Sequence, residues 1–283
     1  MTQSPPAAAP KEFQRFSRFN RVLHVLMIIS FISLAWTGMT LKFSYTGWAR
    51  VLSHAFGGFQ SAGTIHRLAA TLMFGIFGAH LYDLVVYRRA KFGSFRKLLF
   101  NPDTMLPTRK DIQDAVGSFK WFLGKGPRPS YGRWTYWEKF DYIAVFWGMV
   151  VIGSTGLFLW FPELFTRFLP GSLINVATII HSDEALLATG FIFTVHFFNT
   201  HLRPEKFPMD MVIFTGSMTV EEFKEDKPAE YEKLIASGEL EQHLVDPYPP
   251  IVLRAVRFFA GAALTIGLLM VVMIIYAMVF AYR

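Results

Sequence analysis

The chain of 283 residues contains no cysteine, and this absence excludes several redox groups at once. Without a thiolate it offers no c-type haem attachment site, no cysteine-ligated iron–sulfur cluster and no disulfide, so any such centre belongs to a partner protein. Charged residues are also scarce, at 17% of the sequence, whereas 52% of the residues are hydrophobic and 17% are aromatic. That much apolar surface exceeds what one soluble core buries, which places the protein in the membrane class.

The formal net charge of +7 does not indicate a nucleic-acid partner, because Lys and Arg concentrate in particular loops and leave the hydrophobic runs almost bare. Five apolar segments are each long enough to span a hydrocarbon layer about 30 Å thick. They cover residues 22–41, 64–87, 140–161, 177–201 and 251–282. The sequence therefore predicts an all-α integral membrane protein surrounded by lipid.

The distribution of basic residues predicts the orientation of these segments. Arg15, Arg18 and Arg21 precede the first segment, and the loop 88–139 is crowded with Lys and Arg, whereas the loops next to the opposite ends carry few. By the positive-inside rule, the N-terminus and the 88–139 loop are cytoplasmic and the C-terminus is external. We also expect a cytoplasmic N-terminal segment at 1–20 and a cytoplasmic amphipathic segment at 203–250.

Capping patterns predict short helices between the apolar segments. Thr108 and Asp111 resemble a helix start, which favours an amphipathic helix at 108–123. In the 203–250 segment, Pro228 begins a helical stretch that Gly238 closes.

Histidines are the functional candidates, since a metal-binding side chain inside an apolar helix is expensive to bury. His66 and His80 lie fourteen residues apart on the second segment, and His181 and His196 lie fifteen apart on the fourth, with His24 at the start of the first. These spacings separate each pair by about 21 to 22 Å along the helix and keep it within about 40–60° of one face. That is the geometry needed to hold two haems between facing helices.

The predicted topology sorts these histidines by side. His24, His80 and His196 fall near the cytoplasmic surface, while His66 and His181 fall near the outer one. For any one of them the alternative is a hydrogen-bonded histidine of the bundle, but matched spacing on two helices argues against that alternative.

Two further features suit a haem site. Arg21 and Arg67 adjoin candidate ligands, where they either pair with haem propionates or anchor the helices at the interface. A flat cofactor between helices also needs small residues beside it. The glycines available for this are Gly38, Gly75, Gly78, Gly156 and Gly190.

Taken in order, these residues resemble the cytochrome b, or gamma, subunit of respiratory formate dehydrogenases and the related hydrogenase cytochromes b. The resemblance runs from about Arg15 to Glu232. It rests on RVLH at 21–24 leading to Thr37 and Gly38, on Ile65 with His66, on GRWTYWEK at 132–139, on Thr155 and Gly156 with Trp160, on His181 with His196, on FTG at 214–216 and on KPAEY at 227–231. It implies a four-helix dihaem bundle at 21–202, to which a fifth, C-terminal transmembrane helix at 251–283 is added.

The resemblance also implies two haem b groups and their ligands. Carried over by position, His24 and His196 hold the iron of the cytoplasmic-side haem, and His66 and His181 hold that of the outer haem. His80 has no counterpart in the family pattern, and the spacing of fifteen between His181 and His196 is one more than the fourteen that the pattern implies. Spacing alone would make His80 the cytoplasmic-side ligand, whereas the match of the whole first-helix motif favours His24.

A quinone, menaquinone in that family, is expected beside the cytoplasmic-side haem at the loop entering the third helix. Thr135 and Glu138 match that place, with Asn199 and His201 as neighbours. His80 would then contact the quinone or a propionate, or help His201 to hold a third haem. The acid–base candidates for proton uptake are Glu138, His201 and Asp83.

The predicted function is electron transfer between the quinone and an outer-side iron–sulfur or multihaem cytochrome c subunit, within a respiratory complex of the bacterial inner membrane. Two other classes stay open: a membrane anchor without cofactor, and a proton-coupled transporter that uses the histidines as relays. A haem assay distinguishes the electron-transfer function from these two classes, because only the first requires bound haem.

Overall fold

The computed structural model describes residues 10–101 and 103–281, and most of these residues are helical. Within this part of the chain, five helices are long and apolar enough to cross a membrane: Arg18–Lys42, Phe59–Phe92, Tyr136–Trp160, Leu173–Leu202 and Pro250–Phe280. Each overlaps one predicted segment, which confirms the all-α membrane fold. Residues 1–9 of the predicted N-terminal segment and residue 282 of the predicted fifth segment lie outside the described residues.

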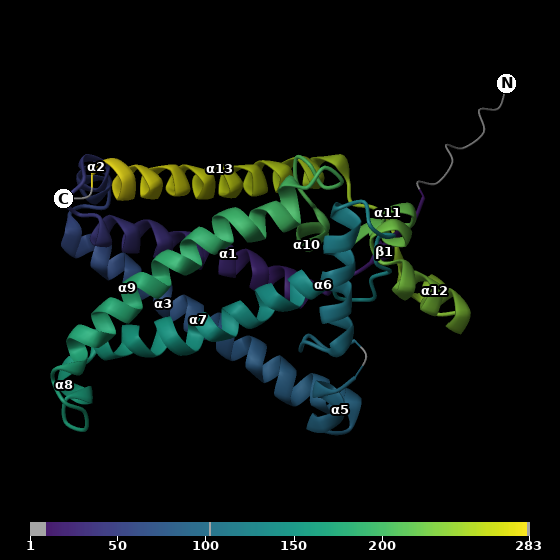
Figure 1. Cartoon of the computed structure of the whole chain (residues 1–283), viewed down its shortest axis with the longest axis horizontal. Helices are drawn as coiled ribbons and strands as arrows, with labels where there is room; N and C mark the ends of the chain where they lie inside the picture. Colours follow the sequence, from purple (N-terminus) through teal and green to yellow (C-terminus); the bar gives the residue numbers. More distant parts are fainter. Residues whose placement is uncertain (1–9, 102, 282–283) are drawn as a thin grey trace. The chain divides into compact units, whose positions relative to one another are not determined.

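The long helices carry labels in Figure 1: α1 (Arg18–Lys42), α3 (Phe59–Tyr82), α7 (Tyr136–Trp160), α9 (Leu173–Phe191) and α13 (Pro250–Phe280). Two of the spans continue through π-helical segments. After α3 comes Asp83–Arg88, which leads into α4 (Arg89–Phe92), and after α9 come Ile192–His196 and Phe198–Leu202. The shorter helices of these regions are α2 (Gly47–Ala55), α5 (Phe95–Leu99) and α8 (Pro162–Phe165).

The chain divides into two compact units, which we call the loop unit and the helix unit. The loop unit consists of Met1–His24, Leu99–Lys139 and Asp210–Phe259. The helix unit consists of Val25–Leu98, Phe140–Met209 and Ala260–Arg283.

In the helix unit, α13 is an integral packing element. Its residues Met270, Ile274 and Ala277 join one buried cluster with residues of α1 and of the fourth span. A Cβ added to Gly267 would lie 2.6 Å from Cδ1 of Phe193, so glycine is needed where α13 meets the π-helical segment of the fourth span.

The loop unit has its own small core and a three-stranded sheet of order β2-β1-β3, which the sequence did not predict. The strands are β1 (Glu12–Gln14), β2 (Ser217–Thr219) and β3 (Leu244–Val245), and both pairings are antiparallel. Phe13 of β1 is 1% exposed and stacks on Phe223 with ring centres 3.7 Å apart. The N-terminal strand therefore anchors the unit.

The helices of the loop unit are α6 (Arg109–Phe122), α10 (Val212–Thr215), α11 (Val220–Asp226), α12 (Pro228–Ser237) and the short 3-10 helix Leu240–His243. The predicted helix starts and stops are confirmed. The backbone N–H of Thr108 donates to Oδ2 of Asp111 at 2.6 Å. Pro228 is the first residue of α12, and Gly238 ends that helix in the left-handed region with φ 69°.

Candidate functional site

On α3, His66 is seated against a Thr-Gly pair of α1. Its Nδ1 lies 3.0 Å from Oγ1 of Thr37. That hydroxyl donates its own hydrogen to the carbonyl oxygen of Ser33 at 2.6 Å, so it accepts the hydrogen bond from Nδ1–H of His66. A Cβ on Gly38 would lie 3.2 Å from Cε1 of the ring. The threonine orients the imidazole, and the glycine lets it approach α1.

His181 of α9 has the same kind of seat on α7. Its Nδ1 donates to the carbonyl oxygen of Ile152 at 3.0 Å and lies 3.4 Å from Oγ1 of Thr155. A Cβ on Gly156 would be only 2.9 Å from Cε1 of His181, which real contacts do not allow. Both histidines are therefore held through Nδ1, and Nε2 is the nitrogen left for a metal.

His66 and His181 also meet each other in the helix unit. Their ring centres lie 6.2 Å apart, and the ring planes are inclined by 75°. With metal–imidazole bonds of about 2.0 Å and about 1.1 Å from nitrogen to ring centre, two imidazoles on opposite sides of one metal ion have centres about 6 Å apart. The observed separation fits a bis-histidine haem site.

His196 is held by a carboxylate instead. Its Nδ1 lies 2.8 Å from Oδ2 of Asp141 on α7, and both side chains are mostly buried. A carboxylate on the far nitrogen fixes the tautomer of a ligating histidine and increases its basicity. The predicted partner, His24, belongs to the loop unit, where its ring lies 6.4 Å from that of Phe214. The pairing of His24 with His196 stays a prediction.

The spacing of the fourth-span histidines has a structural counterpart. His181 and His196 are fifteen residues apart, one more than the family pattern, and the π-helical segment Ile192–His196 lies between them. A π turn accommodates one extra residue within a helix. The additional residue is therefore taken up locally.

His80 differs from His66, His181 and His196 in the ring nitrogen that makes its hydrogen bond. Its Nε2, rather than Nδ1, lies 2.9 Å from the hydroxyl of Tyr142. His201 and Asn199 lie in the second π-helical segment of the fourth span, and the ring of His201 is 6.0 Å from that of Phe197. A third haem held by His80 and His201 stays a prediction.

The residues predicted to bind quinone fall into both units. Thr135 and Glu138 belong to the loop unit, whereas Asn199 and His201 belong to the helix unit, so their grouping stays a prediction. Oε2 of Glu138 accepts from the backbone N–H and the hydroxyl of Thr135, at 2.7 and 2.8 Å, and from Nζ of Lys227 at 2.6 Å. Oε1 accepts from Nη2 of Arg15 at 3.1 Å. Glu138 is thus a fixed acceptor.

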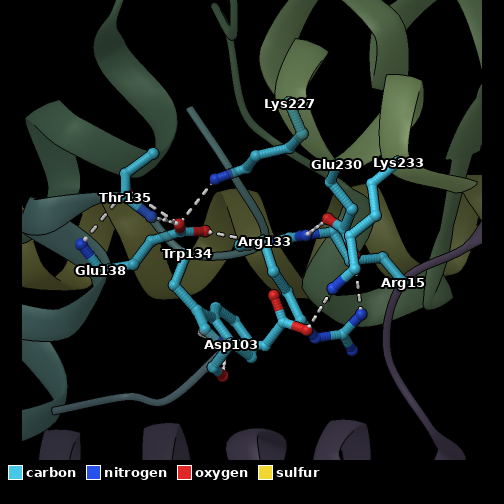
Figure 2. A network of polar contacts seen from close by, with 9 residues as sticks. All are labelled: Arg15, Asp103, Arg133, Trp134, Thr135, Glu138, Lys227, Glu230 and Lys233. Atoms are coloured by element: carbon cyan, nitrogen blue, oxygen red, sulfur yellow. Dashed lines mark hydrogen bonds and ion pairs between the residues drawn. The ribbon is translucent and has the colours of Figure 1, made fainter. Parts of the chain in front are cut away.

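Figure 2 shows that this carboxylate is part of a larger ionic network. Glu230 of α12 accepts from Nη1 of Arg15 at 3.4 Å and from Nη1 of Arg133 at 2.8 Å. Burial lowers the pKa of Lys227 to about 8, and Glu138 counteracts part of that shift. The network was missed from the sequence, although the KPAEY stretch at 227–231 carries two of its members.

Two other predicted polar groups are already engaged. Nη1 of Arg21 donates to the carbonyl oxygens of Phe214 and Thr215, at 3.3 and 2.6 Å, and to the hydroxyl of Tyr248 at 2.9 Å. Arg21 therefore closes the C-terminal end of α10. Asp83, a candidate for proton uptake, pairs with Arg88 at 2.8 Å.

Long apolar helices that hold opposed histidines through Nδ1 define a class of protein, the membrane cytochromes of b type. A family model described as prokaryotic cytochrome b561 matches residues 15–202. The chain belongs to the prokaryotic cytochrome b561 family. A comparison with curated proteins finds no match. The protein is accordingly a multi-pass bacterial membrane protein that binds haem b and transfers electrons.

Proposed function

We propose that this protein is the dihaem cytochrome b subunit of a respiratory oxidoreductase complex, in which it passes electrons between an outer-side redox subunit and menaquinone. The observation that carries the proposal is the pair formed by His66 and His181, with ring centres 6.2 Å apart and each ring held through Nδ1. Histidines that served only to join helices would have no need of an opposed partner at metal-binding distance.

In this proposal His66 and His181 hold the outer haem, and His24 and His196 hold the cytoplasmic-side haem, inside the bundle at 21–202. Bound haem supplies a one-electron centre whose potential depends on its axial ligands and their hydrogen bonds. The protein contributes the orientation of each imidazole. Thr37 and Ile152 fix the outer pair, and Asp141 adds negative charge behind His196.

The quinone headgroup is assigned to Thr135 and Glu138, with Asn199 and His201 as neighbours. Since Glu138 accepts from Thr135, Arg15 and Lys227, its role is to hold donors in place rather than to carry a proton. Asp83 is likewise engaged, in its ion pair with Arg88. His201 is assigned proton uptake at the quinone on its own chemistry, because an imidazole exchanges protons near neutral pH.

The proposed orientation has the N-terminus and the segments 88–139 and 203–250 in the cytoplasm, the C-terminus outside, and the fifth helix as an element that completes the bundle. Basic residues concentrated in the 88–139 loop support it. An iron–sulfur or multihaem cytochrome c subunit then meets the outer haem. Reporter fusions in both segments should read cytoplasmic, and an external signal from the 88–139 loop would reverse the sides of the two haems.

The test is a dithionite-reduced minus oxidised visible spectrum of the purified full chain, combined with a pyridine haemochrome assay. The expected result is two low-spin haem b groups per chain, which menaquinol reduces or menaquinone oxidises. Preparations that contain no haem would overturn the proposal and leave the cofactor-free anchor and the proton-coupled transporter. Two haems that menaquinol does not reduce and menaquinone does not oxidise would overturn only the quinone part.

A further inference from the structure

Helix α6 has an unusual distribution of polar and apolar residues within the loop unit. Its buried side consists of polar residues, namely Asp111, Asp114 and Ser118. Its apolar residues point outward: Ile112, Val116, Phe119 and Phe122 are 67, 51, 66 and 72% exposed. The hydrophobic face of this amphipathic helix is thus not part of the core of the unit.

The exposed apolar residues form one continuous stripe. Ile112, Val116, Phe119 and Leu123 follow one another at steps of four, three and four residues, which keeps them within about 60° around the helix. Phe122 borders this stripe on one side. A contiguous apolar surface of this kind marks a binding site rather than scattered surface residues.

The polar side fastens α6 to the entry of a membrane helix. Oδ2 of Asp111 pairs with Nζ of Lys139 at 2.8 Å, and this lysine lies in the first turn of α7. The hydroxyl of Ser118 is 2.7 Å from that of Tyr131, whose ring lies 5.1 Å from the ring of Trp137, also in that first turn. Because the candidate membrane span Tyr136–Trp160 begins at this turn, α6 is held beside the start of that span.

The residues around this entry have the composition of an interfacial region. Trp134, Tyr136 and Trp137 stand together at the start of α7, and Trp and Tyr are enriched at the headgroup level of membranes. Arg109 and Lys120 are exposed and lie about 50 to 70° from the centre of the apolar stripe, on the side opposite Phe122. Basic residues beside an apolar stripe attract anionic headgroups.

We propose that α6 is an interfacial helix that binds an anionic lipid surface. Its stripe of Ile112, Val116 and Phe119 lies against the acyl chains, and Arg109 and Lys120 contact the phosphates. Lys110 takes no part, since its ammonium pairs with Asp114 at 2.7 Å. The helix would hold the loop unit to one leaflet by a contact that is independent of haem and quinone.

The absence of cysteine makes the test direct, because one introduced cysteine carries one label. The full chain is spin-labelled at Val116→Cys, or at Gln113→Cys as an exposed control on the polar border of the same helix. Each variant is reconstituted into vesicles of phosphatidylcholine alone or with one third phosphatidylglycerol. EPR saturation then compares accessibility to oxygen, which concentrates in lipid, with accessibility to a water-soluble nickel chelate.

The proposal expects the label at 116 to be accessible to oxygen and protected from nickel, and the label at 113 to show the reverse order. Phosphatidylglycerol should shift the label at 116 deeper, and Arg109→Gln with Lys120→Gln should abolish that shift. Free access of nickel to the label at 116 would overturn the proposal. Protection from both reagents would also overturn it, by pointing to a second copy of the chain. An equal depth of the label at 116 in both kinds of vesicle would overturn the proposed binding to anionic lipid.

Discussion

Nδ1 of His196 on α9's π-helical continuation lies 2.8 Å from Oδ2 of Asp141 on α7. A carboxylate in this position gives an imidazole ligand partial imidazolate character, which stabilises ferric iron over ferrous iron. We therefore expect Asp141→Asn to raise the midpoint potential of the cytoplasmic-side haem, on the order of tens of millivolts. An optical redox titration measures this midpoint potential. The control is Asp114→Asn, which removes a carboxylate that pairs with Lys110. Equal midpoint potentials in the two variants would show that Asp141 does not influence a haem.

Histidine replacements on the fourth span test the two-haem arrangement. His181→Ala and His196→Ala should each remove about one haem per chain and leave the other, because each residue serves a different iron in the proposed arrangement. The pyridine haemochrome assay counts the remaining haem. His54→Ala, at an exposed position in α2, should keep both. Retention of two low-spin haems in both variants would show that the fourth span does not supply the ligands.

Gly156 offers a test that leaves every ligand in place. Gly156→Ala adds a methyl group where it would lie 2.9 Å from Cε1 of His181, so the ring has to move. We expect loss or a high-spin shift of the outer haem alone, seen by low-temperature EPR. Gly148→Ala on the same helix is the matched control, since a Cβ there meets only Cδ1 of Ile152 at 3.8 Å, and it should be neutral or slightly stabilising. A normal spectrum of Gly156→Ala would mean that His181 is not a ligand.

His24 and His80 are the two candidate ligands of the proposed cytoplasmic-side haem. Since Nε2 of His80 is engaged with Tyr142, we expect His80→Ala to keep both low-spin haems and to slow quinone turnover. His24→Ala should lose one low-spin haem, because a haem held by one imidazole is bound weakly. Tyr142→Phe serves as the partner variant and should behave like His80→Ala. Loss of a low-spin haem only in His80→Ala would transfer the ligand role to His80, and loss in both would favour a third haem.

Removing the charge of Glu138 tests the ionic network rather than the haems. Glu138→Gln leaves the buried cations of Arg15 and Lys227 without their shared carboxylate, a loss of about 3 kcal/mol in the free energy of unfolding. Thermal unfolding of the purified protein should show a lower midpoint. Asp103→Asn, which breaks a more exposed pair with Lys233, should cost less than about 1 kcal/mol. Equal midpoints for the two variants would contradict a stabilising role for Glu138.

Local patterns predicted the helices and their ends well. The apolar segments were recognisable because a membrane helix needs about 20 consecutive apolar residues, and the start of α6 because Thr108 and Asp111 lie three residues apart. The family resemblance implied the pairing of His66 with His181, and their positions along the helices put both near the outer side. Which face of α6 is buried did not follow, because its polar residues find ion-pair partners that the pattern does not show.

Distant contacts explain the rest of what was missed. The ion pair between Arg15 and Glu230 joins residues 215 positions apart, and β1 is three residues long, too short for an alternating pattern. The π-helical segment Ile192–His196 has no local sequence signal either. The additional residue between His181 and His196 was visible in the sequence. The π-helical turn that accommodates it is a feature of the backbone that the sequence pattern does not show.

The central position of β1 in the sheet also governs when the loop unit can be completed. Both strands that flank it, Ser217–Thr219 and Leu244–Val245, come more than 200 residues later in the chain. At a synthesis rate of about 5 to 20 residues per second, the segment around Phe13 waits for roughly 10 to 50 s before its partners emerge. During that interval Phe13, between the polar Glu12 and Gln14, stays without its strand partners while the membrane helices are inserted, so the loop unit is completed only after residues 244–245 have emerged.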